Sequence, residues 1–218
     1  MKKELYFTPD SIVKKAREML QDVEELRKRH PLKPSPARSA LLVLDMQRYF
    51  LDERSHAFVP SAPAIIPGIV NLVEKCTGNG IPVIFTQHQN SETNAGMMST
   101  WWKELMTAES EYNRIIDEFK KWSKAPLKKN QYDAFYQTEL EETLQQKGVS
   151  QLIICGVMTH LCCETTARSA FVRGFEVFFT IDGTATYNEP FHRATLWNVA
   201  HGFAVPMLID EIIMESGS

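Results

Sequence analysis

Short, continuously apolar runs that alternate with longer amphipathic segments are the feature that most constrains this chain. Five such runs are found, at 40–45, 81–87, 151–157, 175–181 and 204–209. Unbroken apolar runs of this length are typical of strands covered on both faces. The segments between them have apolar residues at helical spacing, at 63–78, 136–148, 162–173 and 189–202. With a weaker strand at 125–129, the sequence predicts an α/β protein. We expect a doubly wound, mostly parallel six-stranded sheet with helices on both faces.

The N-terminal part of the chain precedes this alternation. We expect residues 1–36 to form a helical extension with a Pro-rich linker, and residues 37–218 to form the α/β domain. The pattern predicts a helix over 8–30, with Thr8 as N-cap and Pro9 at the first helical position. One face of this helix is apolar, with Ile12, Ala16, Met19, Leu20, Val23 and Leu26. That face must pack on the main domain or on another subunit.

Charge and cysteine usage exclude several classes of function. A net charge of −3 without a basic block gives no electrostatic signal for nucleic acid or for an anionic membrane. No apolar stretch reaches the roughly 20 residues of a membrane span, and the start "MKKELYFTPD" lacks the apolar core of a secretory signal. The four cysteines lack the spacing of a disulfide-rich secreted protein. We therefore expect a cytoplasmic protein with reduced thiols and with neither a nucleic-acid nor a membrane partner.

Three chemically active side chains come at the carboxyl ends of expected strands. Asp45 ends the first strand, Lys129 ends the weak strand, and Cys162 follows the run 151–157. Ligands of open parallel sheets bind beyond these strand ends, so an acid, a lysine and a thiol at one edge indicate nucleophilic catalysis. Each also has an ordinary interpretation, as a cap, a solvated lysine and a buried small side chain. Spacing alone leaves both interpretations open.

Two adjacent cysteines occupy the segment "GVMTHLCCETTARSA" at 156–170. We expect Cys162 at or near the start of the following helix, where unpaired N–H groups and the helix dipole stabilise a thiolate. Cys163 is rotated from it by about 100° in a helix and is expected to face packing. Cys76 and Cys155 lie in apolar segments and are expected in the core.

Four segments together resemble the isochorismatase-like hydrolase superfamily, which includes isochorismatases, nicotinamidases and N-carbamoylsarcosine amidases. "LLVLDMQRYF" is similar to the first strand of that family with its catalytic aspartate, and "KNQYDAF" is similar to its lysine segment. "CGVMTHLCCETTARSAF" resembles its strand-to-helix turn, and "IDGTATYNEPFHRATL" its last βα unit, with His192 at the family's histidine position. The resemblance runs from about Ala40 to about Ile213 and leaves out the N-terminal helix.

The resemblance implies a catalytic triad of Asp45, Lys129 and Cys162. In this scheme Cys162 attacks a carbonyl carbon to form a thioester and expels ammonia or an amine. Asp45 is the general acid–base, and Lys129 lowers the energy of the charged groups. A non-proline cis peptide between Val157 and Met158 is implied as well, with the N–H groups of Met158 and Cys162 directed at the oxyanion.

The same resemblance implies the residues that contact a small-molecule substrate. Gln47, Phe50 and Tyr132 are expected to line the floor of the pocket. His88, at the end of the second strand, is expected to contact the substrate. His160 is expected either to contact the substrate or to serve as a hydrogen-bonded structural residue.

At two sites the sequence departs from the family pattern, and these departures affect whether a metal is expected and which bond is expected to be hydrolysed. Nicotinamidases carry an Asp-x-His metal motif where this chain has His88 and Asn90, so we predict no bound metal and no cofactor. True isochorismatases carry glycine at the position of Cys162 and cleave a vinyl ether by protonation. The thiol therefore favours hydrolysis of a C–N bond in an amide or ureide. The alternative is a vinyl ether hydrolase with Asp45 as general acid, and a third possibility is a binding or assembly protein without turnover.

Two further expectations concern assembly and the long connection 88–124. Family members are commonly dimers or tetramers, which predicts a homo-oligomer. The connection carries the adjacent Trp101 and Trp102. It is a candidate lid and the part of the domain expected to determine the substrate.

Overall fold

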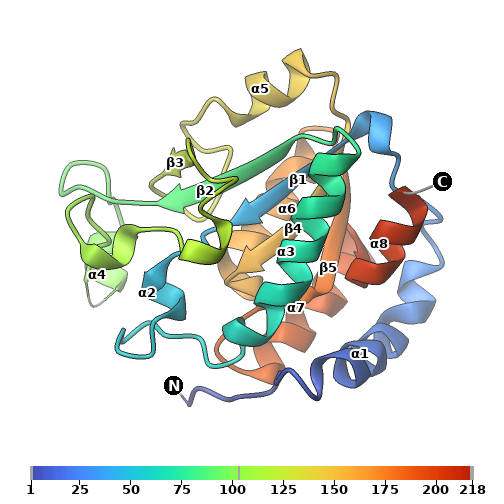
Figure 1. Ribbon diagram of the computed structural model, residues 1–218, viewed down its shortest axis with the longest axis horizontal. Coiled ribbons are helices and arrows are strands. Elements are labelled where there is room, and N and C mark those ends of the chain that lie inside the picture. Colours follow the sequence, from blue (N-terminus) through green and yellow to red (C-terminus); the bar gives the residue numbers. More distant parts are fainter. Residues whose placement is uncertain (1, 103, 217–218) are drawn as a thin grey trace.

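The computed structural model describes residues 2–102 and 104–216 and contains one six-stranded sheet (Figure 1). The strands are β1 (Ser39–Leu44), β2 (Val83–His88), β3 (Leu127–Lys129), β4 (Gln151–Val157), β5 (Glu176–Ala185) and β6 (Val205–Met207). They are ordered β3-β2-β1-β4-β5-β6, and each neighbouring pair is parallel. The expected fold class is confirmed, with the weak strand and the five apolar runs all in the sheet.

The two central strands explain why the apolar runs are continuous. Every residue of β1 and β4 is buried, because helices cover both faces of the sheet. The strand order reverses between these two strands, since β2 and β3 lie on one side of β1 while β4 to β6 lie on the other. A reversal of this kind opens a crevice at the carboxyl ends of the flanking strands. Asp45 and the turn that holds Cys162 lie at these ends.

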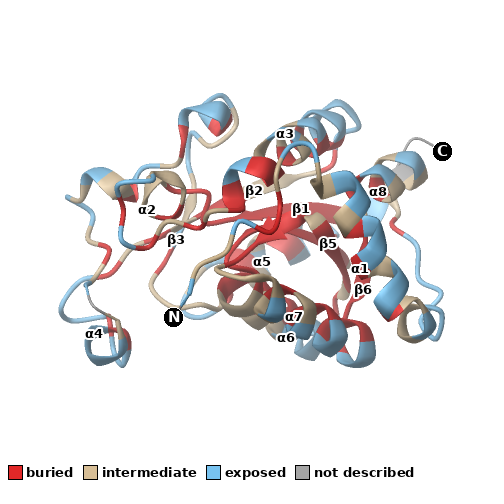
Figure 2. Cartoon of the chain, turned by 90° about the horizontal axis from the view of Figure 1, so that it is seen from below, coloured by how far each residue is buried: buried red, intermediate tan, exposed pale blue. Residues whose placement is uncertain are grey.

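Helices form a layer on each side of the sheet, which Figure 2 shows nearly edge-on. One layer contains α3 (Ala62–Gly78) and α8 (Ile209–Ser216). The other contains α5 (Leu140–Gln146), α6 (Glu164–Val172) and α7 (Glu189–Gly202). Short elements that the apolar pattern did not indicate are α2 (Arg48–Leu51), α4 (Met98–Trp101) and the single turns Pro36–Arg38, Glu111–Asn113 and Asp117–Phe119.

The N-terminal helix, α1 (Ile12–Arg27), begins later than expected. The Thr8 hydroxyl accepts a hydrogen bond from the Ser11 backbone N–H at 3.2 Å, and the Thr8 carbonyl accepts from the Ile12 N–H at 3.0 Å, which are the contacts of an N-cap residue one turn before the regular helix. The expected apolar face is correct, because its central residues are buried and the others pack against the core. This face contacts α7, β5 and β6 of the same chain. An ion pair of 2.6 Å between Lys15 and Glu189 of α7 adds to the contact.

The connection 88–124 contains only short helical turns. Lys103 within it lies outside the described residues. Its second half is tied to the end of β1, because Ile115 forms an antiparallel bridge with Gln47. No helix in the described ranges has the length and apolarity needed to cross a membrane.

The backbones of β1 and β4 approach closely just before the crevice. Gly156 of β4 has a φ of 114°, and a Cβ built there would lie 2.1 Å from the carbonyl oxygen of Leu44. Only glycine fits this position without strain, because the conformation and the contact both exclude a side chain. Leu44 directly precedes Asp45, so the glycine also determines how near that carboxylate lies to β4.

We predict that Gly156→Ala lowers the free energy of unfolding by about 3 kcal/mol or more, since it combines a backbone clash with a strained φ. The matched control is Gly202→Ala at the end of α7, where nothing lies within 4 Å of a built Cβ. That change should leave the free energy of unfolding within about 1 kcal/mol of the parent. Urea denaturation of both variants measures the difference, and equal midpoints would contradict the prediction.

Candidate active site

The structure brings Asp45, Lys129 and Cys162 together at the carboxyl edge of the sheet. Asp45 follows β1, Lys129 is the last residue of β3, and Cys162 lies in the five-residue π-helical turn Thr159–Cys163 after β4. The Lys129 Nζ lies 2.7 Å from Asp45 Oδ2 and 3.5 Å from Cys162 Sγ. One ammonium therefore touches both the carboxylate and the thiol. The expected juxtaposition of the three side chains is present.

Asp45 is held by its backbone conformation and by one neighbour on β2. Its φ of 51° is left-handed, a conformation that aspartate tolerates better than most residues. Thr86 bonds to it twice, since its hydroxyl accepts from the Asp45 N–H at 3.1 Å and donates to Oδ1 at 2.6 Å. These bonds orient the second carboxylate oxygen, Oδ2, toward Lys129.

The carboxylate and the ammonium stay charged in a site without solvent contact. Burial alone would raise the pKa of Asp45, but the adjacent Lys129 charge, followed by His88 and by hydrogen bonds from Lys129 and Thr86, holds that pKa below its ordinary value. Burial likewise favours a lower pKa for Lys129, and the adjacent Asp45 charge outweighs it and raises this pKa above the ordinary value. Lys129 also donates to the backbone carbonyl of Gln131 at 2.9 Å.

Cys162 differs from the expectation of a resting thiolate. Burial raises its pKa to about 12; Lys129 opposes this rise, whereas the Asp45 charge adds to it. The thiol is therefore protonated at neutral pH. We expected Cys162 at or near the start of a helix, where a thiolate is stabilised. Instead, Cys162 lies in a π-helical turn before α6 begins at Glu164. A thiol in this state acts as a nucleophile only if a neighbouring base takes its proton, and Asp45 is the carboxylate that shares the Lys129 ammonium with it.

The other three cysteines are packing residues, as expected. Cys76, Cys155 and Cys163 are buried and free, and burial raises the pKa of each thiol. Cys163 has no exposed surface, although it is adjacent to Cys162 in sequence.

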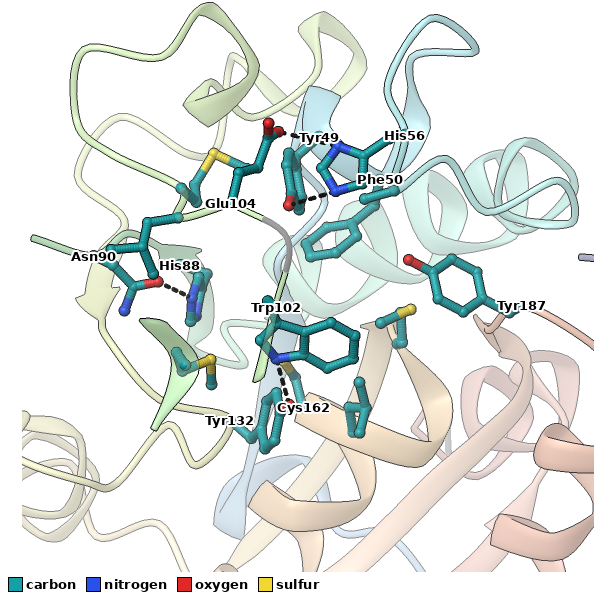
Figure 3. Close-up of a pocket in the computed structure, with 16 residues that line it drawn as sticks. Tyr49, Phe50, His56, His88, Asn90, Trp102, Glu104, Tyr132, Cys162 and Tyr187 are labelled. Carbon is teal, nitrogen blue, oxygen red and sulfur yellow. Dashed lines mark hydrogen bonds and ion pairs between the residues drawn. The ribbon is translucent and has the colours of Figure 1, made fainter. Parts of the chain in front are cut away.

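A pocket opens above the Cys162 sulfur (Figure 3). It has a volume of about 750 Å³, part of which is open to solvent. Aromatic and other apolar side chains form most of its wall: Tyr49, Phe50, Ala57, Met98, Trp102, Leu105, Met106, Tyr132, Met158, Leu161 and Tyr187. The polar groups are few, with His88 and Asn90 on one side and His56 and Glu104 at the top in Figure 3. The pocket suits a small, largely apolar ligand with a few polar groups.

Two of the expected substrate contacts lie outside this pocket. Gln47 has no exposed surface; its side chain donates to the His88 and Asn113 carbonyls and accepts from the His88 N–H, so it joins loops behind the pocket. His160 stacks on Phe191 with 4.3 Å between ring centroids, and its Nδ1 lies 2.6 Å from the Thr186 hydroxyl. His160 is therefore the structural residue of the two alternatives.

The remaining expected positions line the pocket. Phe50, His88, Tyr132 and Met158 are all part of its wall. The Val157–Met158 peptide bond is cis. Trp102 closes one side and donates from its indole N–H to the Tyr132 hydroxyl at 2.7 Å. Trp101 points away and is 73% exposed.

His88 lies between Asn90 and Lys129, with one ring nitrogen toward each. Lys129 can only donate, so the His88 Nδ1 at 3.5 Å accepts and its Nε2 donates to Asn90 Oδ1 at 2.8 Å. Burial and the Lys129 charge lower the pKa of His88 to about 4, so the ring is neutral. Both ring nitrogens are thus engaged, one of them by a cation. Among the described residues, no group of three or more His, Cys, Asp or Glu side chains is arranged to hold a metal ion.

Some pocket residues were not identified from the sequence. Tyr187 follows β5, so the strand-end rule that found Asp45 also applies to it. His56 and Glu104 come from irregular segments and lie 3.1 Å apart as an ion pair when the histidine is protonated. Nothing in their local sequence indicates that they meet, because the contact depends on how two separate loops fold over the pocket.

Known proteins resemble this chain along most of its length. The family model described as "Isochorismatase domain" matches residues 39–211. Nicotinamidase 3 of Arabidopsis thaliana is 40% identical over 193 residues, which cover 86% of this chain and 92% of that protein. Enterobactin synthase component B of Escherichia coli is 30% identical over 181 residues, which cover 82% of this chain and 63% of that protein.

A solved structure agrees in fold. The cysteine hydrolase from Pseudomonas syringae pv. phaseolicola superimposes with a TM-score of 0.80 at 24% identity. The superposition covers 84% of this chain and 94% of that one. The range matched by the family model, 39–211, spans all six strands of the sheet. The chain belongs to the isochorismatase family and is a hydrolase of that family.

Proposed function

We propose that this hydrolase cleaves the C–N bond of a small neutral amide, with Cys162 as nucleophile. The observation that carries the proposal is the position of Lys129, whose Nζ lies 2.7 Å from Asp45 Oδ2 and 3.5 Å from Cys162 Sγ at the base of an apolar pocket. A thiol, a carboxylate and an ammonium in contact are the groups that nucleophilic acyl transfer requires.

The proposed steps follow from these contacts. Asp45 takes the thiol proton as the sulfur bonds to the substrate carbonyl carbon, whose oxygen becomes an oxyanion. The C–N bond then breaks, and the leaving nitrogen takes the proton from Asp45. Water attacks the resulting thioester while Asp45 accepts one of its protons. The carbon–sulfur bond breaks, the sulfur regains that proton, and the acid leaves.

Lys129 and the backbone of the turn would stabilise the charges that develop. Lys129 keeps Asp45 ionised before the reaction and keeps the sulfur in contact with a positive charge when the thiol loses its proton. The N–H groups of Met158 and Cys162, both residues of the pocket wall, are the proposed donors to the oxyanion.

The pocket supports a neutral and planar substrate. Its walls are aromatic on several sides, with Tyr49, Phe50, Trp102, Tyr132 and Tyr187. None of the described lining residues is lysine or arginine, while Glu104 supplies a carboxylate. Among these described residues, a substrate carboxylate would therefore have no lysine or arginine to pair with. An aromatic carboxamide fits this chemistry, in agreement with the name of the Arabidopsis thaliana relative.

The second candidate is cleavage of a vinyl ether with Asp45 as general acid. The resemblance to isochorismatases favours it, and Asp45 occupies the same place in both schemes. It leaves Cys162, in contact with Lys129 at the pocket base, without a role. The amide reaction uses all three side chains.

Two other expectations belong with this proposal. We propose a cytoplasmic enzyme, supported by four cysteines that remain free thiols. The homo-oligomer implied by the family resemblance stays a prediction.

We predict that Cys162→Ala lowers turnover of a carboxamide by about ten-thousand-fold or more, because the nucleophile is lost. The matched control is Cys163→Ala, which removes the neighbouring buried thiol and should keep most of the activity. Ammonia release across a panel of aromatic and aliphatic amides measures both variants, and cleavage of isochorismate is followed separately through the carbonyl product that vinyl ether hydrolysis releases. Undiminished amide hydrolysis by Cys162→Ala would contradict the proposal, and isochorismate cleavage by that variant would favour the second candidate.

We also predict that kcat/KM is independent of pH from about 5.5 to about 9, because no catalytic group titrates in that window. The lowered pKa of Asp45 and the raised pKa of Lys129 keep both charged throughout. His88, with its pKa near 4, stays neutral, and Cys162, with its pKa near 12, stays protonated until Asp45 takes the proton. A pH–rate profile in constant ionic strength tests this, and an inflection between about pH 6 and 8 would point to a histidine as the base instead.

A further inference from the structure

We propose that the N-terminal segment 3–7 positions groups of the active site. Tyr6 positions the nucleophile turn, Thr159–Cys163, and Lys3 positions the pocket wall that contains His56 and Tyr187. The segment lies outside the family match, which begins at residue 39. It nevertheless reaches three elements that surround the pocket. The inference rests on the proposed function only where rates are measured, since the contacts themselves are independent of the substrate.

Tyr6 reaches the nucleophile turn through one buried histidine. Its hydroxyl accepts from the Thr186 N–H and lies 3.0 Å from Nδ1 of His192. The same Nδ1 lies 3.2 Å from the hydroxyl of Thr159, the first residue of the turn that ends at Cys163. Burial lowers the pKa of His192 to about 3, so this ring is a neutral link. The path from Tyr6 to the turn is three side chains long and fully enclosed.

Lys3 and Glu4 reach the opposite wall of the pocket. The Lys3 ammonium donates to the backbone carbonyls of His56 at 2.6 Å and Phe58 at 2.8 Å. It also lies 4.5 Å from the centre of the Tyr187 ring, and the Glu4 N–H donates to the Tyr187 carbonyl at 2.7 Å. His56 and Tyr187 both line the pocket. Lys3 and Glu4 thus hold together two pocket segments, one at His56 and one at Tyr187, that are far apart in sequence.

The segment is anchored firmly enough to act as a support. Phe7 has no exposed surface and Tyr6 is 4% exposed. Their backbone N–H groups both donate to the Ser61 hydroxyl, at 2.9 Å for Tyr6 and 3.0 Å for Phe7. Both rings pack against His192 with centroid distances near 5 Å, 5.4 Å for Tyr6 and 5.3 Å for Phe7. Tyr6 and Phe7 are therefore part of the core and anchor the segment, whereas Leu5 is exposed and Lys3 is half-buried.

Two kinds of effect on the reaction follow from these positions. A displaced turn moves the sulfur and the oxyanion donors, which lowers kcat because those groups act in the transition state. A loosened wall weakens binding of substrate and transition state alike, which raises KM. Tyr6 is thus a positioning residue for chemistry and Lys3 is one for binding. If the segment served only the stability of the fold, substitutions at Tyr6 and Lys3 would not divide into an effect on kcat and an effect on KM.

The first test is Tyr6→Phe, which keeps the ring and removes the hydroxyl. We expect kcat to fall on the order of tenfold with little change in KM, below the ~100-fold that a 1 Å misplacement can cost. Hydrogen exchange of the backbone over 156–163 should become faster. The matched control is Ser39→Ala, which removes another buried hydroxyl bond, to Gln151, at the opposite end of β1. It should leave kcat and this exchange unchanged.

The second test is Lys3→Met, which keeps a long side chain and removes both donors. We expect KM to rise with kcat retained, and exchange over 52–60 to become faster. The matched control is Lys2→Met, the same change at the exposed neighbouring lysine, which should alter neither.

The outcomes separate the role of segment 3–7 from the proposed amide hydrolysis. Unchanged kcat and exchange in Tyr6→Phe, or equal changes in Ser39→Ala, would overturn the role of Tyr6. Equal effects of Lys2→Met and Lys3→Met would overturn the role of Lys3. If the parent enzyme hydrolyses no amide, the proposed function fails, while the exchange measurements still decide whether segment 3–7 supports the turn and the wall.

Discussion

The buried ion pair of Asp45 and Lys129 is the interaction on which the site depends. Neither side chain has exposed surface, so the cost of removing two charges from water is offset only by close contact and by further hydrogen bonds. Thr86 and the Gln131 carbonyl provide those bonds. Lys129 comes from β3 and Asp45 follows β1, with β2 between them. The parallel register of three strands is therefore what lets the pair form.

This pair also gives the proposed mechanism a way for a protonated thiol to act as a nucleophile. In many cysteine enzymes a nearby positive charge keeps the sulfur ionised at rest. Here the positive charge of Lys129 is largely neutralised by Asp45, and burial keeps the proton on Cys162. In the proposed mechanism, the carboxylate that neutralises the lysine is then the base for the thiol. An apolar wall around the site keeps water away and strengthens each of these interactions.

Much of this arrangement could be predicted from the sequence, for identifiable reasons. Continuous apolar runs indicated the parallel sheet, and strand ends located Asp45, Lys129 and Cys162. The charge state of Cys162 could not be predicted in this way, because it depends on burial by residues distant in sequence. The same holds for Tyr6, which meets His192 across 186 positions of the chain. Gln47 was expected in the pocket from the family resemblance, but its amide donates to the His88 and Asn113 carbonyls behind the pocket.

The role of Asp45 as the base for the Cys162 thiol is tested most directly by the pH dependence of Cys162 alkylation by iodoacetamide. Peptide mass spectrometry measures the alkylation rate in the parent protein and in Asp45→Asn. If Asp45 takes the thiol proton, the parent rate is constant from about pH 6 to 9, since the pair of groups exchanges no proton with solvent there. The rate in Asp45→Asn then depends on pH, because the proton must leave to solvent. A parent rate that rises about tenfold per pH unit, with the same profile in the variant, would show that Asp45 is not the base.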